Sequence, residues 1–115
     1  PAGIIAAARE KDMGIIVKVP IANALYEKPR SEAGNTALWD RAQTILSPEC
    51  VGDLPRVEAA LRWLLCDGNV HTAIVGTTNV NHFEANVAAV ERGRLSDEML
   101  ADMKTRFEQA VAGSD

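Results

Sequence analysis

The first twenty residues contain a helical pattern followed by a strand pattern. Residues 2–12 are rich in alanine, carry their isoleucines on one side and stop before Gly14, which predicts a helix with a glycine stop. Residues 15–19 form an almost unbroken β-branched run closed by Pro20, which predicts a central strand of a parallel sheet. Lys18 is the one charged residue in this run, and we expect its amine to reach solvent or a carboxylate rather than a ligand.

The middle of the chain predicts a long connection and two helices. Residues 21–35 lack a sustained period and contain proline and glycine, as in a surface connection. A helical stripe follows over residues 38–46, in which Trp39 is a packing residue, and stops at Ser47. The next helix opens with Asp53 as its N-cap. The side chains expected to be buried are Leu25 and Tyr26 in the connection and Leu54, Val57, Leu61, Leu64 and Leu65 in the second helix.

Residues 72–86 change from an apolar run to a polar turn to a helix. Residues 73–75 predict a short strand buried on both faces, and residues 76–79, Gly-Thr-Thr-Asn, form the turn. A helix then extends to Gly93, and its N–H groups and positive dipole end would suit an anion at the turn. An ordinary strand-to-helix connection explains the spacing equally well and is much commoner. The apolar period of this helix consists of Phe83, Val87 and Val90.

A last helix is predicted after Ser96, its N-cap, with Asp97 and Glu98 in the first turn. Its apolar positions are Leu100, Met103, Phe107 and Val111. Strands that alternate with helices imply parallel strands joined by crossovers, so an α/β barrel or a doubly wound sheet is expected.

Composition limits the kinds of protein that this chain can be. Its 115 residues are one domain's worth, residues 1–115, and too few for a complete large α/β barrel. An apolar fraction of 47% with no run long enough to span a bilayer excludes a membrane protein. A net charge of -4 with scattered Lys and Arg argues against a nucleic-acid partner.

The cysteines and histidines predict no metal site. Cys50 and Cys66 share no ligand spacing with each other or with His71 and His82, and His71 is expected to be structural. With no signal peptide visible, reduced thiols and a cytoplasmic location are expected. Because the chain starts at Pro1, inside a helical pattern, we expect that an N-terminal part has been lost.

Two stretches, VPIANAL at 19–25 and IVGTTNVNHFEAN at 74–86, follow the two predicted strands at the edge where α/β folds bind ligands. Both resemble the C-terminal part of the NADP-dependent aldo/keto reductases, in which they are the seventh and eighth barrel strands. The resemblance covers nearly the whole chain, from REKDMGIIVKVPIANAL to LSDEMLADMKTRFE. It implies a partial (β/α)8 TIM-barrel fragment with two parallel strands and about five helices.

The resemblance also implies a cofactor site for NADP(H). It implies that the Gly76-Thr77-Thr78 turn lines the pocket of the adenosine 2′-phosphate and that His82 faces this phosphate. Hydroxyl donors, helix amides and a cationic ring are the groups that would hold such an acceptor. The complete implied set is Pro20, Ile21 and Asn23 beside the pyrophosphate, and Gly76, Thr77, Thr78, His82 and Asn86 around the 2′-phosphate and adenine.

Departures from the family pattern concern both cofactor contacts and catalysis. Many members have glycine at the position of Ala24, and some have lysine and glutamate at the positions of Gly76 and Ala85. The family's Asp, Tyr, Lys and His tetrad comes from earlier barrel strands, so no catalytic residue is assigned here. Tyr26, the one tyrosine, lies in the loop after the first strand and is not assigned as the acid.

Three interpretations remain open for the function. The chain is the NADP(H)-binding C-terminal portion of an aldo/keto reductase, in which case it does not reduce carbonyl compounds alone. Alternatively, it is a stand-alone NADP-binding or adenine-nucleotide-binding module, or a non-catalytic structural or interaction protein derived from a reductase. Because two strands cannot close a barrel, we expect a homodimer or higher oligomer that buries residues 15–19 and 73–75, or a missing N-terminal barrel half.

Overall fold

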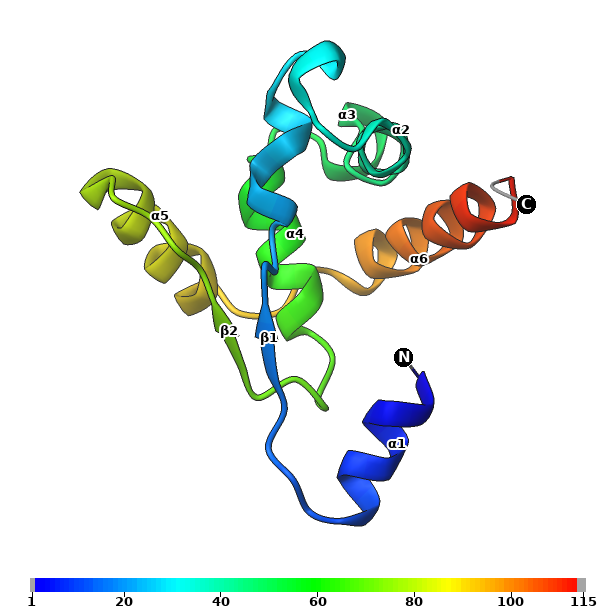
Figure 1. Cartoon of the computed structure of the whole chain (residues 1–115), viewed down its shortest axis with the longest axis vertical. Coiled ribbons are helices and arrows are strands. Elements are labelled where there is room, and N and C mark those ends of the chain that lie inside the picture. Colours follow the sequence, from blue (N-terminus) through cyan, green and yellow to red (C-terminus); the bar gives the residue numbers. More distant parts are fainter. Residues whose placement is uncertain (1, 114–115) are drawn as a thin grey trace.

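The computed structural model describes residues 2–113 and pairs two short parallel strands among helices (Figure 1). Strand β1 (Ile16–Lys18) pairs with β2 (Thr72–Ile74) in parallel. His71 extends this pairing, because its Nδ1 accepts the Ile15 N–H at 2.9 Å, so its predicted structural role is confirmed. The helices are α1 (Ala2–Glu10), η1 (Ala22–Glu27), η2 (Arg30–Glu32), α2 (Thr36–Ile45), α3 (Pro48–Val51), α4 (Arg56–Leu65), α5 (Val80–Glu91) and α6 (Asp97–Ala112).

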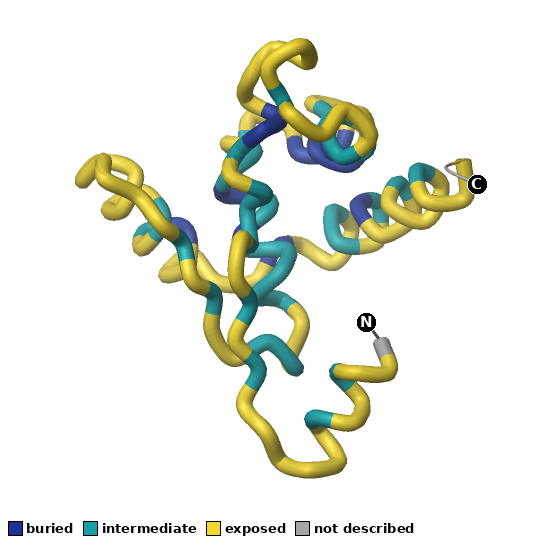
Figure 2. The backbone as a smooth tube through the Cα atoms, in the orientation of Figure 1, coloured by how far each residue is buried: buried dark blue, intermediate teal, exposed yellow. Residues whose placement is uncertain are grey.

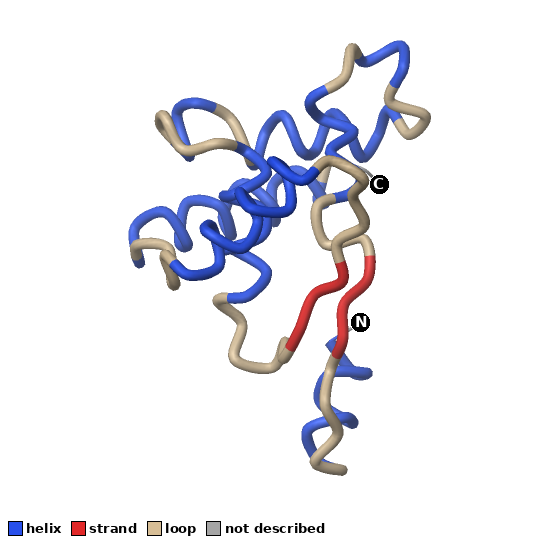
Figure 3. Tube along the Cα trace, turned by 90° about the vertical axis from the view of Figure 1, so that its left-hand side faces the viewer, coloured by secondary structure: helices blue, strands red, loops and turns tan. Residues whose placement is uncertain are grey.

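One face of the two-stranded sheet is open. Because strand side chains alternate, Ile16 and Ile74 share one face, while Val17 and Ala73 lie half-buried on the other. Ile16 is 64% exposed and Ile74 60% exposed. In Figure 3 the helices other than α1 lie to one side of the strands or beyond their carboxyl ends. The prediction that both faces of the second strand are buried is therefore wrong for the single chain, because nothing covers the other face.

The hydrophobic core lies among the helices rather than on the sheet. Figure 2 shows the buried segments gathered above and beside the strands. Leu25 and Tyr26 are buried in η1, as predicted, and Trp39 packs against the same cluster, as predicted. The buried residues of this core are Leu25, Tyr26, Ala42, Ile45, Leu46, Cys50, Val51, Ala59, Leu95 and Met103.

The segment between β1 and α4 contains more helix than the sequence predicts. The connection of residues 21–35 includes the 3₁₀ helices η1 and η2, and α3 follows α2 after Ser47. Asn35 is the N-cap of α2, since its Oδ1 accepts the Leu38 N–H at 2.9 Å. The long loop is therefore a folded segment, and the described part of the chain has one α-helix more than the five expected.

Helix α4 begins later than predicted and buries a different stripe. Its N-cap position is Pro55, without a side-chain cap, because Gly52 turns the chain at φ 59 after α3 and Asp53 stays outside the helix. The predicted cap at Asp53 is therefore wrong. The most buried residues of α4 are Glu58, Ala59 and Leu61, so only one of the five predicted apolar positions is fully buried.

The last two helices have the predicted boundaries. Helix α5 ends before Gly93, whose φ of 75 suits glycine, and the Ser96 Oγ accepts the Met99 N–H at 3.2 Å to cap α6. Met103 is fully buried, as its apolar position predicts. The apolar period of α5 is exposed instead, and Ala89 is the residue that this helix buries.

Candidate functional site

A cleft of about 740 Å³ opens at the carboxyl ends of the two strands. One wall is the segment from Lys18 to Ala24, and the other comprises residues 74–77 and the first turns of α5. Its volume is within the range of small-molecule sites. The carboxyl edge of parallel strands is also where α/β folds bind ligands. The cleft is therefore the candidate site.

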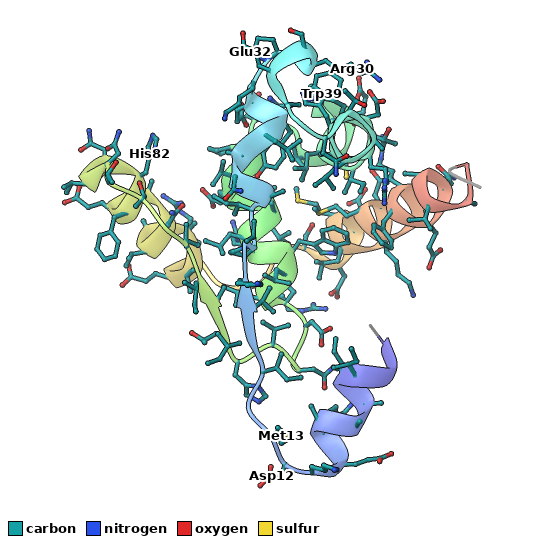
Figure 4. All side chains as sticks on the ribbon, in the orientation of Figure 1. Asp12, Met13, Arg30, Glu32, Trp39 and His82 are labelled. Atoms are coloured by element: carbon teal, nitrogen blue, oxygen red, sulfur yellow. The ribbon has the colours of Figure 1, made fainter. Side chains whose placement is uncertain are left out.

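Seven of the eight residues implied by the family resemblance line this one cleft. Thr78 is exposed and does not contribute to the lining. His82 projects from the first turn of α5, as Figure 4 shows, and Asn86 lies one turn further along. The seven lining residues are Pro20, Ile21, Asn23, Gly76, Thr77, His82 and Asn86. Parallel pairing brings the two groups together although more than fifty positions separate them in sequence.

The N-terminus of α5 uses its own side chains to satisfy its first N–H groups. The Asn79 Oδ1 accepts the N–H of Asn81 at 2.9 Å and of His82 at 3.4 Å. The Thr77 Oγ1 accepts the Asn79 N–H at 3.1 Å. The expectation that unpaired helix amides point at the turn is therefore wrong for these three groups, because N-capping occupies them. Within residues 2–113, the N–H groups of Gly76 and Thr77 have no such partner and remain available to a ligand.

Three titratable side chains line the cleft. Lys18 forms no ion pair among the described residues, so the expected alternative of a carboxylate partner is not observed. Its exposure agrees with the other expectation, contact with solvent. Glu27 is held by Arg56, whose Nη2 lies 2.9 Å from the Glu27 Oε2. His82 is exposed on α5. The cleft therefore offers a lysine and a histidine to an anion, with its one carboxylate already paired.

The wall formed by the residues after β1 and the start of η1 has an unusual backbone. Val19, Ala22, Asn23 and Ala24 all have φ between 50 and 56, in the left-handed region. This conformation is unfavourable for residues other than glycine, asparagine and aspartate, and most unfavourable for a β-branched residue such as Val19. Strained backbone of this kind clusters at ligand sites. No sequence pattern indicates it, although the family's preference for glycine at the position of Ala24 agrees with a left-handed φ there.

Tyr26 lies outside the cleft, in the core beside it. The side chain is 3% exposed and its hydroxyl has no hydrogen-bond partner among the described residues. Burial and the neighbouring Glu27 raise the pKa of Tyr26 to about 12. The Arg56 guanidinium carbon lies 5.6 Å from the ring centroid. Tyr26 is therefore a packing residue, and it lines none of the cleft.

Residues 2–113 contain neither a candidate metal site nor a candidate membrane-spanning helix. No group of three or more His, Cys, Asp and Glu side chains in this range could hold a metal ion. Nor is any helix in this range long and apolar enough to cross a membrane.

Comparison with known proteins gives one match. No curated protein and no solved structure matches the chain significantly. The family model described as the aldo/keto reductase family matches residues 1–106, which is all but the last nine of the 115 residues. The chain therefore belongs to the aldo/keto reductase family.

Proposed function

We propose that this chain is the cofactor-binding C-terminal portion of an aldo/keto reductase and that its cleft holds NADP(H). The observation that carries the proposal is the convergence of seven implied residues on one cleft of about 740 Å³. Membership of an oxidoreductase family supports the same assignment. Neither the groove beside α2, α4 and α6 nor the small cavity at Arg62 and Gly93 combines the carboxyl ends of both strands with a helix N-terminus.

The proposed contacts follow from the chemistry of the cofactor. The 2′-phosphate is a strong acceptor, and the Thr77 hydroxyl, the free N–H groups of the turn and the His82 ring are suitable donors. The pyrophosphate would lie along Pro20 and Ile21, with Lys18 near enough to add a positive charge. Asn86, one turn beyond His82, would meet the adenine.

We also propose that the described chain does not reduce carbonyl compounds by itself. Hydride transfer leaves an alkoxide that needs a proton from a general acid of suitable pKa. The one tyrosine, Tyr26, lies outside the cleft, and burial raises its pKa to about 12. Binding of cofactor without turnover is the expected behaviour.

The test is a titration of the full chain with NADPH, followed by the fluorescence of the nicotinamide. We expect saturable binding that Thr77→Val weakens about tenfold, because one hydrogen bond to a charged group contributes about 1.5 kcal/mol or more. Thr77→Ser keeps the hydroxyl and should restore binding. Thr78→Val is the matched control, since Thr78 does not line the cleft, and it should leave the affinity within about twofold.

Two results would count against the proposal. Absence of saturable binding at millimolar NADPH would remove the cofactor role and favour a structural or interaction protein. If Thr77→Val and Thr78→Val weakened the affinity for NADPH equally, the phosphate would be assigned to a position outside the cleft.

We further propose that a second copy of the chain covers the open face of the sheet. The exposed isoleucines Ile16 and Ile74 lie diagonally on this face, beside Thr72 and Lys18 respectively, and each strand has one unpaired edge within the described chain. Unpaired strand edges beside exposed apolar side chains pair readily with another chain.

A further inference from the structure

Helix α1 is an amphipathic helix without a partner. It has nine residues, and it packs closely against no other described element. Its apolar stripe consists of Ile4, Ile5 and Ala8, and Ile4 is 75% exposed. A helix of this length is marginal in water unless an apolar face is buried. Its stability in the folded chain therefore requires a docking surface.

An apolar groove of about 440 Å³ lies beside the carboxyl end of β1. It is bordered by η1, α2, α4 and α6, and in Figure 1 α1 lies below α6. Trp63 and Phe107 meet edge to face at one end, with ring centroids 6.0 Å apart, and Phe107 is 44% exposed. The apolar lining includes Leu38, Ile45, Trp63, Leu64 and Phe107. Such a groove suits the side chains of one short helix.

The connection between α1 and β1 can act as a hinge. Asp12 has a φ of 52, and Gly14 follows it before the strand begins at Ile16. Figure 4 shows Asp12 and Met13 at this turn, away from the rest of the molecule. Residues 11–14, ahead of Ile15 and its pairing with His71, can span up to about 14 Å when extended. Rotation at this turn can therefore bring α1 toward the groove without breaking the strand pairing.

Charges at the rim of the groove complement those of α1. Arg41 and Asp67 line the rim, and neither has an ion pair within residues 2–113. The last turn of α1 and the residue after it carry Arg9 and Lys11, whose positive charges are opposite in sign to Asp67. These pairs would set the direction of docking more than its strength.

We propose that α1 is a hinged arm that closes into the groove between α4 and α6 of its own chain. Ile4 and Ile5 then contact Trp63 and Phe107, and the groove gains the apolar occupant that it lacks. A short tether gives an effective concentration in the millimolar range, which favours the same chain over a second copy. Pro20 and Ile21 line both this groove and the cleft, so the closed arm supports the wall that the two cavities share.

Disulfide trapping tests the docked position. In a Cys66→Ser background, Ile5→Cys with Phe107→Cys places thiols on the apolar stripe and in the groove. We expect an intrachain disulfide to form under mild oxidation at least tenfold faster than in the matched control, Ala6→Cys with Phe107→Cys, because residue 6 lies on the opposite side of α1. Equal rates for both pairs would overturn the proposal. A predominantly interchain disulfide would also overturn it, by assigning the groove to α1 of a second copy.

Tryptophan emission gives an independent measurement without introduced cysteines. In a Trp39→Phe background, Trp63 reports the polarity of the groove. Ile5→Asp should shift its emission to longer wavelength, whereas Ala6→Asp should not, and circular dichroism would verify that both variants keep their other helices. The same emission in both variants would contradict docking of the arm. Neither measurement requires a cofactor, so its result is independent of NADP(H) binding.

Discussion

Individual buried residues have ionisation properties that follow from their packing. Cys50 is 9% exposed in the core. Burial and the neighbouring carboxylate of Asp102 raise the pKa of the Cys50 thiol to about 11. A thiol held protonated in this way is a poor nucleophile, so Cys50 is a structural cysteine.

The raised pKa of Cys50 makes stability depend on pH above 9. The ordinary thiol pKa is 9.0, so the contribution of Cys50 is complete below pH 9 and is lost as the pH rises to about 11. The free energy of unfolding, measured with urea, should be lower at pH 10.5 than at pH 8 in the unmodified chain. This decrease should be about 1–2 kcal/mol smaller in Cys50→Ala. Cys66→Ala is the control and should keep the full loss. An identical loss in Cys50→Ala would mean that the thiol ionises as freely in the folded state as in the unfolded state.

The contact between helices α4 and α5 depends on one buried carboxylate, that of Glu58. Glu58 is 9% exposed and lies 2.9 Å from the Arg62 Nη1 and 2.7 Å from the Arg92 Nη1. Arg62 also donates to the carbonyl oxygens of Gly93 and Arg94 after α5. This cluster fixes α5, and with it His82 and Asn86, against the rest of the chain.

Removal of Glu58 should cost more than removal of Arg92, its exposed partner. Glu58→Ala leaves the Arg62 guanidinium, which is 13% exposed, without its carboxylate, so a loss of about 3 kcal/mol in the free energy of unfolding is expected. Arg92 is 55% exposed, and Arg92→Ala should cost about 1 kcal/mol or less. Denaturant unfolding of both variants measures the difference. Equal losses would contradict a central role for the buried carboxylate.

The elements could be predicted where local signals decide them. The cap at Ser96, the stop at Gly93 and the strand before Pro20 are all local, and each is present. The expected central position of that strand is wrong for the described chain, because it pairs with one neighbour and keeps an unpaired edge. The burial of Glu58 could not be predicted, because it depends on Arg92, which lies 34 positions away. The exposure of the α5 stripe was missed for the same reason, since an apolar period indicates only that a face needs a partner.

The sequence indicated which residues come together at the candidate site, but it did not indicate the backbone conformation of the site. Of the eight residues that the two motifs indicated, all but Thr78 line one cleft, because parallel pairing aligns the ends of their strands. The left-handed φ values at Val19 and Ala24 had no signal in residue type. Such strain depends on the surrounding fold, so a single sequence does not reveal it.

At the scale of the whole molecule, the open face of the sheet is the part of the fold that most needs a covering partner. Ile16 and Ile74 lie diagonally on it, with exposed fractions of 64% and 60%, and both strands have an unpaired edge in the described chain. A net charge of -4 over 115 residues opposes association only weakly at physiological ionic strength. Association through this face is therefore expected.

Sedimentation equilibrium of the full chain at micromolar concentration should give the mass of a dimer or larger assembly. Ile74→Lys places a second lysine beside Lys18, its cross-strand neighbour, on the proposed interface and should shift the mass toward 12.4 kDa, that of one chain, because burying two like charges together costs several kcal/mol. Thr105→Lys adds the same charge on the exposed surface of α6 and should leave the assembly intact. A folded monomer in the unmodified chain would show that the strands tolerate an exposed face, and an Ile74→Lys variant that remains assembled would move the interface elsewhere.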